Sequence, residues 1–308
     1  MKKQLNITWN NVQDSTGYLF SFAKSLSCAV RNSPYAEFAE DIIATSGFAF
    51  RMWVTADLCP SATSIWDFDS QKPWVENGGL LCNYVGRYWG QEHLEKEKRL
   101  EAIENIKKSI DNGIAAISWD IGVPEWGLIT GYDDETQNLF VQQTNINEPT
   151  PMPYDVLGKR ELPILSVLTI TGKSDKSQDD ILKDTMKLAV THLNGEEWCD
   201  NAKGLEAYPR LISIFESNPD IAASWNADYF LGTYGALKEF AYIYFKKAGQ
   251  TELAQINKEV FESWLNAFKI KTSQDAALSE VRAKIVSLLQ SAYKNEKKAV
   301  EIMTALIK

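Results

Sequence analysis

The feature that most constrains the fold is a pair of short apolar runs within residues 125–143. The first run closes in Gly-Tyr-Asp-Asp at residues 131–134, and the second is Leu-Phe-Val-Gln-Gln at residues 139–143. Short apolar runs joined by turn residues are typical of buried strands. The pattern predicts a β-hairpin, and with it an antiparallel sheet in the first half of the chain.

Histidine is scarce in this sequence. His93 lies in a charged run typical of a solvated helix surface, and His192 lies within a predicted helix outside the half that carries the hairpin. A thiol or hydroxyl nucleophile usually needs an adjacent base, most often histidine, and a lone helical histidine is usually structural. A conventional Cys–His enzyme is therefore disfavoured.

Length and composition predict a soluble protein of two domains. The 308 residues are 44% hydrophobic and 24% charged, as in ordinary globular proteins. No apolar run approaches the roughly 18 residues of a membrane span, and the basic start at residues 1–10 lacks the apolar core of a secretion signal. We expect a cytoplasmic protein without a membrane partner.

Charge and cysteine spacing exclude several classes of partner. A net charge of -9, with lysines interspersed among the acids, argues against binding to nucleic acid. The cysteines form no Cys-x-x-Cys pair and have no neighbouring histidine, so we predict no metal site, no cofactor and reduced thiols. They are Cys28, Cys59, Cys82 and Cys199.

The pattern of apolar residues divides the chain into a mixed part and a helical part. Helices are predicted at residues 18–31, 34–44 and 92–112, followed by a strand at 114–120 and the hairpin. A further apolar strand at 164–170 is followed by polar residues.

We place a domain boundary after residue 172. The first domain, residues 1–172, combines helices with an antiparallel sheet, and the second, residues 173–308, is all helical. Its predicted helices cover residues 177–194, 203–217, 222–248, 252–270 and 274–307.

Four segments resemble proteins of the butirosin biosynthesis protein H-like family. They are Ser46–Arg51, Leu58–Ala62, Glu125–Asp134 and Gly204–Tyr208. The resemblance implies an α+β fold in which a papain-like N-terminal domain precedes a helical region. It also implies an acyl-transfer lineage, because butirosin protein H resembles cysteine peptidases and moves an aminoacyl group from a carrier protein to an aminoglycoside.

The resemblance implies a catalytic histidine at the start of the hairpin strand, where this chain has Glu125. It implies a cysteine at the N-terminus of the first long helix, where the helix dipole stabilises a thiolate. Ser15 and Thr16 lie near that place, whereas Cys28 lies about three turns further along the predicted helix and is interpreted as a core residue.

The third position, an orienting Asp or Asn on the next strand, falls at Gln142 or Gln143. All three catalytic positions are therefore altered. Three departures together favour a site that no longer performs this chemistry.

Other constellations remain open. Ser15 or Thr16 can serve as a hydroxyl nucleophile with Glu125 as base, although both hydroxyls are also good capping residues and a carboxylate is a poor base for an alcohol. Cys59, in a loop with Asp57, is a candidate relocated thiol without a visible base.

Aromatic and acidic residues are dense in the first half, where seven of the ten tryptophans lie before residue 127. Such residues suit a pocket for an amine-bearing molecule, through cation–π and carboxylate contacts, although tryptophans more often anchor cores. The candidate ligand-binding residues are Tyr18, Trp119, Asp120, Trp126 and Gln142.

We therefore expect a catalytically degenerate papain-like protein that binds a small amine-bearing molecule or a peptide in its cleft. One alternative is an acyltransferase or amidohydrolase of papain-like ancestry, for which the resemblance implies a carrier-protein-bound acyl group as partner. A second is a scaffold or dimerisation protein that acts through its helical domain. The sequence leaves the oligomeric state open.

Overall fold

The computed structural model describes residues 1–10, 12–160 and 162–308, which form two compact units. Unit 1 comprises residues 1–12, 21–42 and 67–176, and unit 2 comprises residues 13–20, 43–66 and 177–308. The predicted boundary followed residue 172. In the structure, two N-terminal segments, 13–20 and 43–66, instead pack with the helices of unit 2.

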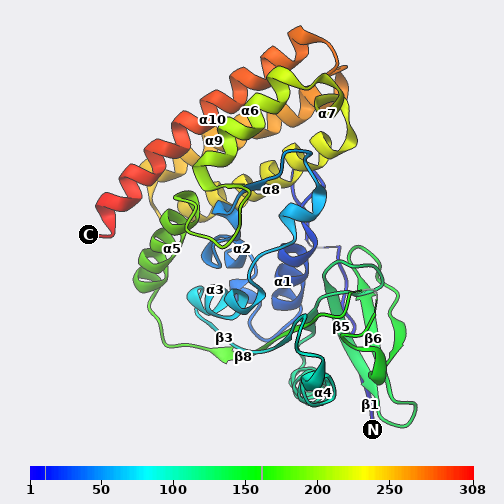
Figure 1. Cartoon of the computed structure of the whole chain (residues 1–308). Helices are drawn as coiled ribbons and strands as arrows, with labels where there is room; N and C mark the ends of the chain where they lie inside the picture. Colours follow the sequence, from blue (N-terminus) through cyan, green and yellow to red (C-terminus); the bar gives the residue numbers. More distant parts are fainter. Residues whose placement is uncertain (11, 161) are drawn as a thin grey trace. The chain divides into compact units, whose positions relative to one another are not determined.

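Unit 1 combines helices with an antiparallel sheet (Figure 1). Its helices are α1 (Ser21–Arg31), α3 (Gln71–Asn77) and α4 (Glu95–Asp111), and the short α2 (Ile42–Thr45) starts at its edge. Its strands are β1 (Lys2–Gln4), β3 (Leu80–Arg87), β4 (Ala116–Ser118), β5 (Gly127–Asp133), β6 (Asn138–Gln143), β7 (Thr150–Pro153) and β8 (Leu165–Lys173).

The strand order is β3-β8-β4-β5-β6-β7, and the predicted hairpin is confirmed as β5 and β6. β4 pairs with residues 127–129 of β5, and β1 pairs with residues 131–133. A Cβ atom on Gly131 would lie 2.7 Å from the Lys3 carbonyl oxygen. Glycine at this point of the Gly-Tyr-Asp sequence therefore allows β1 to join the sheet.

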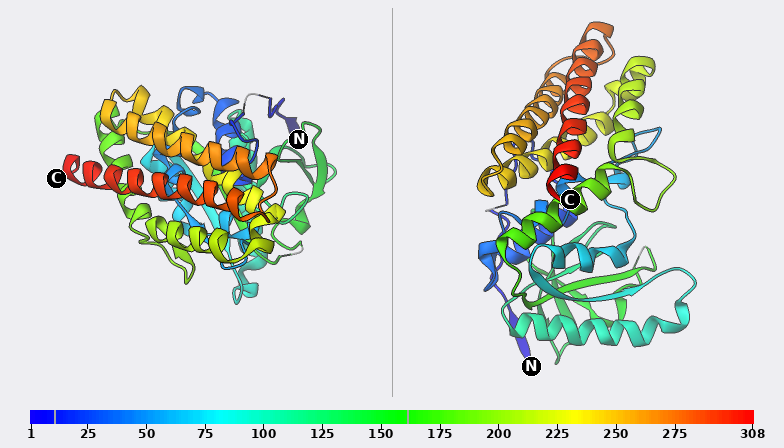
Figure 2. Two further views of the ribbon diagram at one scale, coloured as in Figure 1. Left: turned by 90° about the horizontal axis from the view of Figure 1, so that it is seen from above. Right: turned by 90° about the vertical axis from the view of Figure 1, so that its left-hand side faces the viewer.

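Helices α1 and α4 cover opposite faces of this sheet (Figures 1 and 2). Helix α4 turns Ile103, Ile106 and Ile110 towards Ile129 and Leu139 of the hairpin, and all five side chains are buried. This apolar stripe on an otherwise charged helix is what the sequence pattern indicated.

The predicted helix at residues 34–44 is wrong. The segment instead forms a 3-10 turn at Ala36–Phe38 and the four-residue α2. The Ala39 carbonyl accepts a hydrogen bond from Ser27 Oγ of α1 at 3.1 Å, a tertiary contact that local spacing does not encode.

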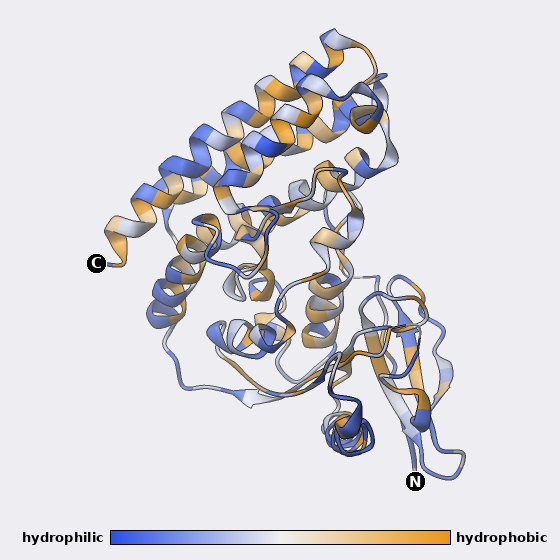
Figure 3. Cartoon of the chain, in the orientation of Figure 1, coloured by the Kyte–Doolittle hydropathy of each residue, from blue (hydrophilic) through white to orange (hydrophobic). Residues whose placement is uncertain are grey.

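Unit 2 is mainly helical, as predicted for the C-terminal part. Its helices are α5 (Gln178–Leu193), α6 (Ala207–Ser217), α7 (Pro219–Ala223), α8 (Trp225–Lys247), α9 (Thr251–Ser273) and α10 (Ser279–Leu306), and strands β2 (Trp53–Val54) and β9 (Ala202–Lys203) form a small ribbon. The long helices lie side by side in both views of Figure 2. Polar and apolar residues alternate around α9 and α10 (Figure 3), the pattern of helices buried on one side.

A buried polar network joins four of these helices. Lys238 of α8 and Glu296 of α10 form an ion pair, and each side chain is only 1% exposed. Beside them, Trp264 of α9 donates a hydrogen bond to Tyr208 of α6 at 2.8 Å. Burial, reinforced by the Glu296 charge, raises the pKa of Tyr208 far above its ordinary value. Among the described helices, none combines the length and apolar character that a membrane span requires.

Replacing Lys238 alone tests the importance of this network. We expect Lys238→Met to lower the free energy of unfolding by about 3–5 kcal/mol, because it leaves Glu296 buried without its partner. The double variant Lys238→Met/Glu296→Leu should recover most of the loss. Urea unfolding measures both, and a double variant no more stable than the single one would contradict the prediction.

Candidate functional site

Ser21, the first residue of α1, meets Glu125 at the start of the hairpin. The Ser21 hydroxyl donates a hydrogen bond to Glu125 Oε2, and the backbone N–H of Trp126 donates to Ser21 Oγ at 3.3 Å. Both side chains are partly exposed. A hydroxyl at a helix start therefore faces a carboxylate at a strand start.

The loop before β5 fixes the position of Glu125. The Glu125 carbonyl accepts a hydrogen bond from the Ile121 N–H at 3.1 Å, which closes a tight turn. Asp120 and Gly122 both adopt positive φ, at 60° and 80°. A Cβ on Gly122 would clash with the side chain of Gln143, so this position needs glycine.

The aromatic residues next to this pair form a packed core. The Trp126 ring contacts the rings of Phe22, Phe68 and Trp119, with centroids 4.8, 4.9 and 5.3 Å away. Trp126 is 1% exposed and Trp119 is 7% exposed. Asp120 is also buried, and its carbonyl accepts a hydrogen bond from Arg160. The structure thus places these predicted cleft residues in the interior of unit 1.

Gln142 does not orient Glu125. Its side-chain amide donates hydrogen bonds to the carbonyls of Ile7, at 3.3 Å, and Asn147. The residue therefore ties two loops to the sheet through its side-chain amide.

Ser15 and Thr16 lie before the helix, and the expected helix start at residue 18 is wrong. The Asp14 carboxylate accepts hydrogen bonds from the backbone N–H groups of Thr16 and Gly17, and Gly17 has a φ of 76°. This capped turn delays the helix until Ser21.

All three predicted residues of this turn have partners within unit 2. Ser15 Oγ donates to Glu239 at 2.6 Å, and Thr16 Oγ1 donates to the Gly232 carbonyl at 2.8 Å. The Tyr18 ring covers Gly232, where a Cβ would lie 2.7 Å from the ring. The structure therefore brings Ser21, and not Ser15 or Thr16, to Glu125.

The two candidate cysteines differ in environment. Burial raises the pKa of Cys28 to about 12, so its thiol stays protonated at neutral pH. Cys59 is partly exposed, and its backbone N–H donates to Thr55 Oγ1 at 2.8 Å. It lines a cavity of about 540 Å³ in unit 2.

Behind that cavity lies a buried group of charges that sequence reasoning missed. Arg51 Nε contacts Glu197 at 2.8 Å, and His192 Nδ1 contacts the other carboxylate oxygen at 2.8 Å. Burial opposes ionisation of Glu197, but the Arg51 charge and the His192 hydrogen bond outweigh it and hold the pKa below its ordinary value. Arg51 and Glu197 are 146 residues apart, so no local signal could pair them.

Three of the four segments singled out in the sequence lie around this group. A Cβ on Gly47 would be 2.6 Å from His192 Nε2, and Arg51 ends the same segment. Gly204 donates its N–H to the Met52 carbonyl at 2.9 Å. Residues 59, 61 and 62 line the cavity itself.

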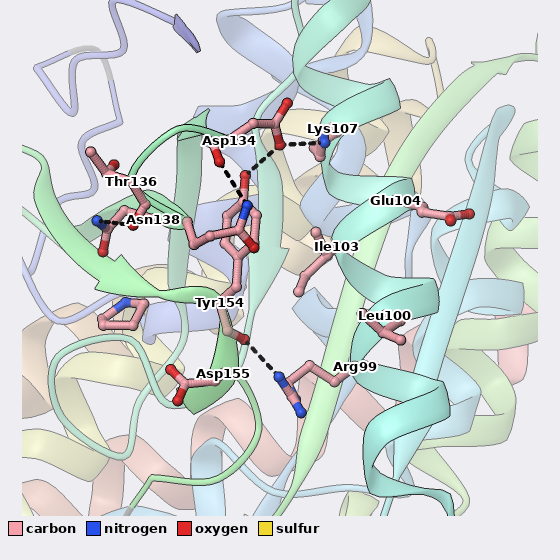
Figure 4. Close-up of a pocket in the computed structure, with 12 residues that line it drawn as sticks. Arg99, Leu100, Ile103, Glu104, Lys107, Asp134, Thr136, Asn138, Tyr154 and Asp155 are labelled. Atoms are coloured by element: carbon pink, nitrogen blue, oxygen red, sulfur yellow. Dashed lines mark hydrogen bonds and ion pairs between the residues drawn. The ribbon is translucent and has the colours of Figure 1, made fainter. Parts of the chain in front are cut away.

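Unit 1 has a second cavity, of about 660 Å³, between α4 and the end of the hairpin (Figure 4). Asp134 is its central polar group, because Lys107 contacts it at 2.5 Å and Tyr154 donates to it at 3.1 Å. Hydrogen bonding from Lys107 lowers the pKa of Asp134. Lys107 and Asp134 satisfy each other there, whereas Arg99 pairs with Glu95 outside the labelled set.

Within the described residues, no three His, Cys, Asp or Glu side chains gather as a metal site. His93 is exposed in a 3-10 turn. Comparison of the sequence with models of protein families and with curated proteins gave no match in either case.

We expect Ser21→Ala to lower the free energy of unfolding by about 1–3 kcal/mol, because the Glu125 carboxylate and the Trp126 N–H both lose a partner. Glu125→Gln should cost less, since an amide oxygen still accepts from Ser21. Denaturant unfolding measures the losses. The exposed Ser217→Ala is the matched control, and a Ser21→Ala variant as stable as that control would contradict the prediction.

The loss of folding stability at acid pH should depend on Glu197. A carboxyl whose folded pKa is lowered contributes stability above its unfolded value, about 4.5, and loses it as the pH falls through the folded pKa. The Glu197→Gln variant lacks this contribution at every pH. Its stability deficit relative to the wild type should therefore shrink below pH 4.5, which thermal unfolding across pH can measure. A deficit that stays constant would exclude this role.

Proposed function

We propose that unit 1 has the papain-like layout, with Ser21 and Glu125 at the places of the catalytic cysteine and histidine. Three observations support this. Ser21 begins a helix packed against an antiparallel sheet, Glu125 precedes a strand of that sheet, and the two side chains hydrogen-bond. These are the relative places that a papain-like peptidase gives to its nucleophile and its base.

In this proposal the pair is not catalytic. A carboxylate is a poor base for the proton of an alcohol, whereas imidazole matches a thiol well. The Ser21 hydroxyl already donates to Glu125 and accepts from Trp126, so its hydrogen-bonding capacity is used within unit 1. Gln142, at the orienting position, is bonded to backbone carbonyls.

The function that the geometry supports best is binding of an amine-bearing small molecule or peptide without cleavage. The observation that carries it is the hydrogen bond from Ser21 to Glu125, at the places where the proposed layout would have a thiol and an imidazole. A net charge of -9 also favours a cationic ligand.

One observation favours a second candidate function. Because the Ser21 hydroxyl touches a carboxylate at a helix N-terminus, Ser21 is also placed to act as the nucleophile of an acyltransferase or amidohydrolase, with Glu125 as base. This alternative requires an activated hydroxyl, which a chemical probe can detect.

A serine-directed fluorophosphonate probe separates the two candidates. We expect Ser21 to stay unlabelled, with the wild type and Ser21→Ala giving the same background by mass spectrometry. Labelling that is mapped to Ser21 and lost in Ser21→Ala would refute the non-catalytic proposal and leave the acyl-transfer candidate.

Restoring the ancestral pair tests the papain-like layout itself. In Ser21→Cys/Glu125→His, the introduced thiol should react with iodoacetamide at pH 6–7 at least about tenfold faster than in Ser21→Cys alone. The imidazole takes its proton and the helix start stabilises the thiolate. Cys28, with a pKa raised to about 12, is a slow internal reference. Equal rates in the two variants would count against the layout.

A further inference from the structure

The cavity in unit 2 lies between the β2–η3 segment and the loop before β9. Residues 53–65 supply one side of it and residues 198–201 the other, where η3 is the 3-10 turn Pro60–Thr63. Two tryptophans define its walls. Trp53 is 2% exposed and Trp198 is 69% exposed, with ring centroids 6.1 Å apart and planes at 50°.

Trp53 is held rigidly in place. The Arg51 guanidinium lies 4.1 Å from the centroid of its ring, and Arg51 is itself fixed by Glu197. The Trp53 backbone exchanges two hydrogen bonds with the Tyr234 hydroxyl, at 2.8 and 2.5 Å. One wall of the cavity is thus preorganised, which lowers the entropic cost of binding.

The charge balance around the cavity leaves a negative group unpaired. The Arg51 charge is matched by Glu197, and Lys203 donates to the carbonyls of Glu197 and Cys199. The exposed Asp200 lines the cavity and makes no hydrogen bond or ion pair within the described residues. Its carboxylate is therefore available to a cation.

A second unsatisfied group belongs to the opposite wall. Within the described part of the chain, the buried indole N–H of Trp53 has no hydrogen-bond acceptor. A buried donor without a partner costs about 1–3 kcal/mol. This nitrogen has almost no accessible surface, so a molecule in the cavity does not reach it.

We infer that this cavity binds a small organic ammonium ion. Trp198 supplies an aromatic face for the cation, and Asp200 supplies the counter-charge. The volume of about 540 Å³ suits a compact small molecule. This inference rests on the proposed binding function for its ligand class, but its site is independent of Ser21 and Glu125.

Choline is the probe, and its neutral isostere 3,3-dimethyl-1-butanol is the control ligand. Binding is followed through the indole ¹H–¹⁵N signals, assigned with single Trp variants, and by calorimetry. We expect choline to shift the Trp53 and Trp198 signals in a saturable manner. The isostere should bind at least about fivefold more weakly, as the loss of a cation–π contact predicts.

Two variants test the contributing groups. Trp198→Leu and Asp200→Asn should each weaken choline binding at least about fivefold. Trp89→Leu, which alters a tryptophan 64% exposed in unit 1, should leave it unchanged. Matching circular dichroism spectra and unfolding midpoints show that each variant is folded.

Absence of saturable choline binding, equal affinity for the isostere, or an unchanged affinity in both site variants would overturn the inference. A result that overturns this inference can be told apart from one that overturns the proposed function. Labelling of Ser21 by fluorophosphonate overturns the non-catalytic proposal alone, whereas lost choline selectivity with an unlabelled Ser21 overturns only the ammonium site.

Discussion

The complete burial of β5 is the constraint on which unit 1 depends. All seven residues of Gly127–Asp133 are buried, so the backbone groups of the strand need partners along both edges. β6 supplies one edge, and β4 and β1 share the other. At the point where β5 begins, the Trp126 N–H finds its acceptor in Ser21 Oγ. Ser21 thus joins helix α1 to the sheet, and Glu125 accepts the hydrogen bond that this hydroxyl donates. The contact has a structural reason that requires no catalysis.

In unit 2, buried charged side chains likewise need partners. Lys238 is paired with Glu296, and Arg51 with Glu197, because an unpaired buried charge is costly. The two pairs have different consequences. The first joins α8 to α10 in the middle of the helices. The Arg51–Glu197 pair holds Arg51 against Trp53, so it shapes the wall of a cavity.

The sequence predicted the elements whose signals are local. The hairpin, α4 and the long C-terminal helices follow from periodicity and turn residues, and their observed ends differ from the predicted ones by a few residues. β1 was missed because its pairing is with β5, far along the chain. β3 was also missed, because exposed Leu81 and buried Arg87 break the polar–apolar alternation that predicts a strand. The site was less predictable. Glu125 was found, but its partner Ser21 lies 104 residues away, and the better capping residues at 14–16 drew the predicted helix start to the wrong place.

The two candidate sites differ in what they leave for a ligand. At Ser21 and Glu125, the hydroxyl is both donor and acceptor to its own unit, and the tryptophans beside it are closed into the core. At the unit 2 cavity, the exposed Asp200 carboxylate has no partner within the described residues, and Trp198 is 69% exposed. Binding energy comes from groups that gain a partner, because a group already satisfied gains little from a ligand. By this measure the unit 2 cavity leaves more for a ligand than the Ser21–Glu125 pair does.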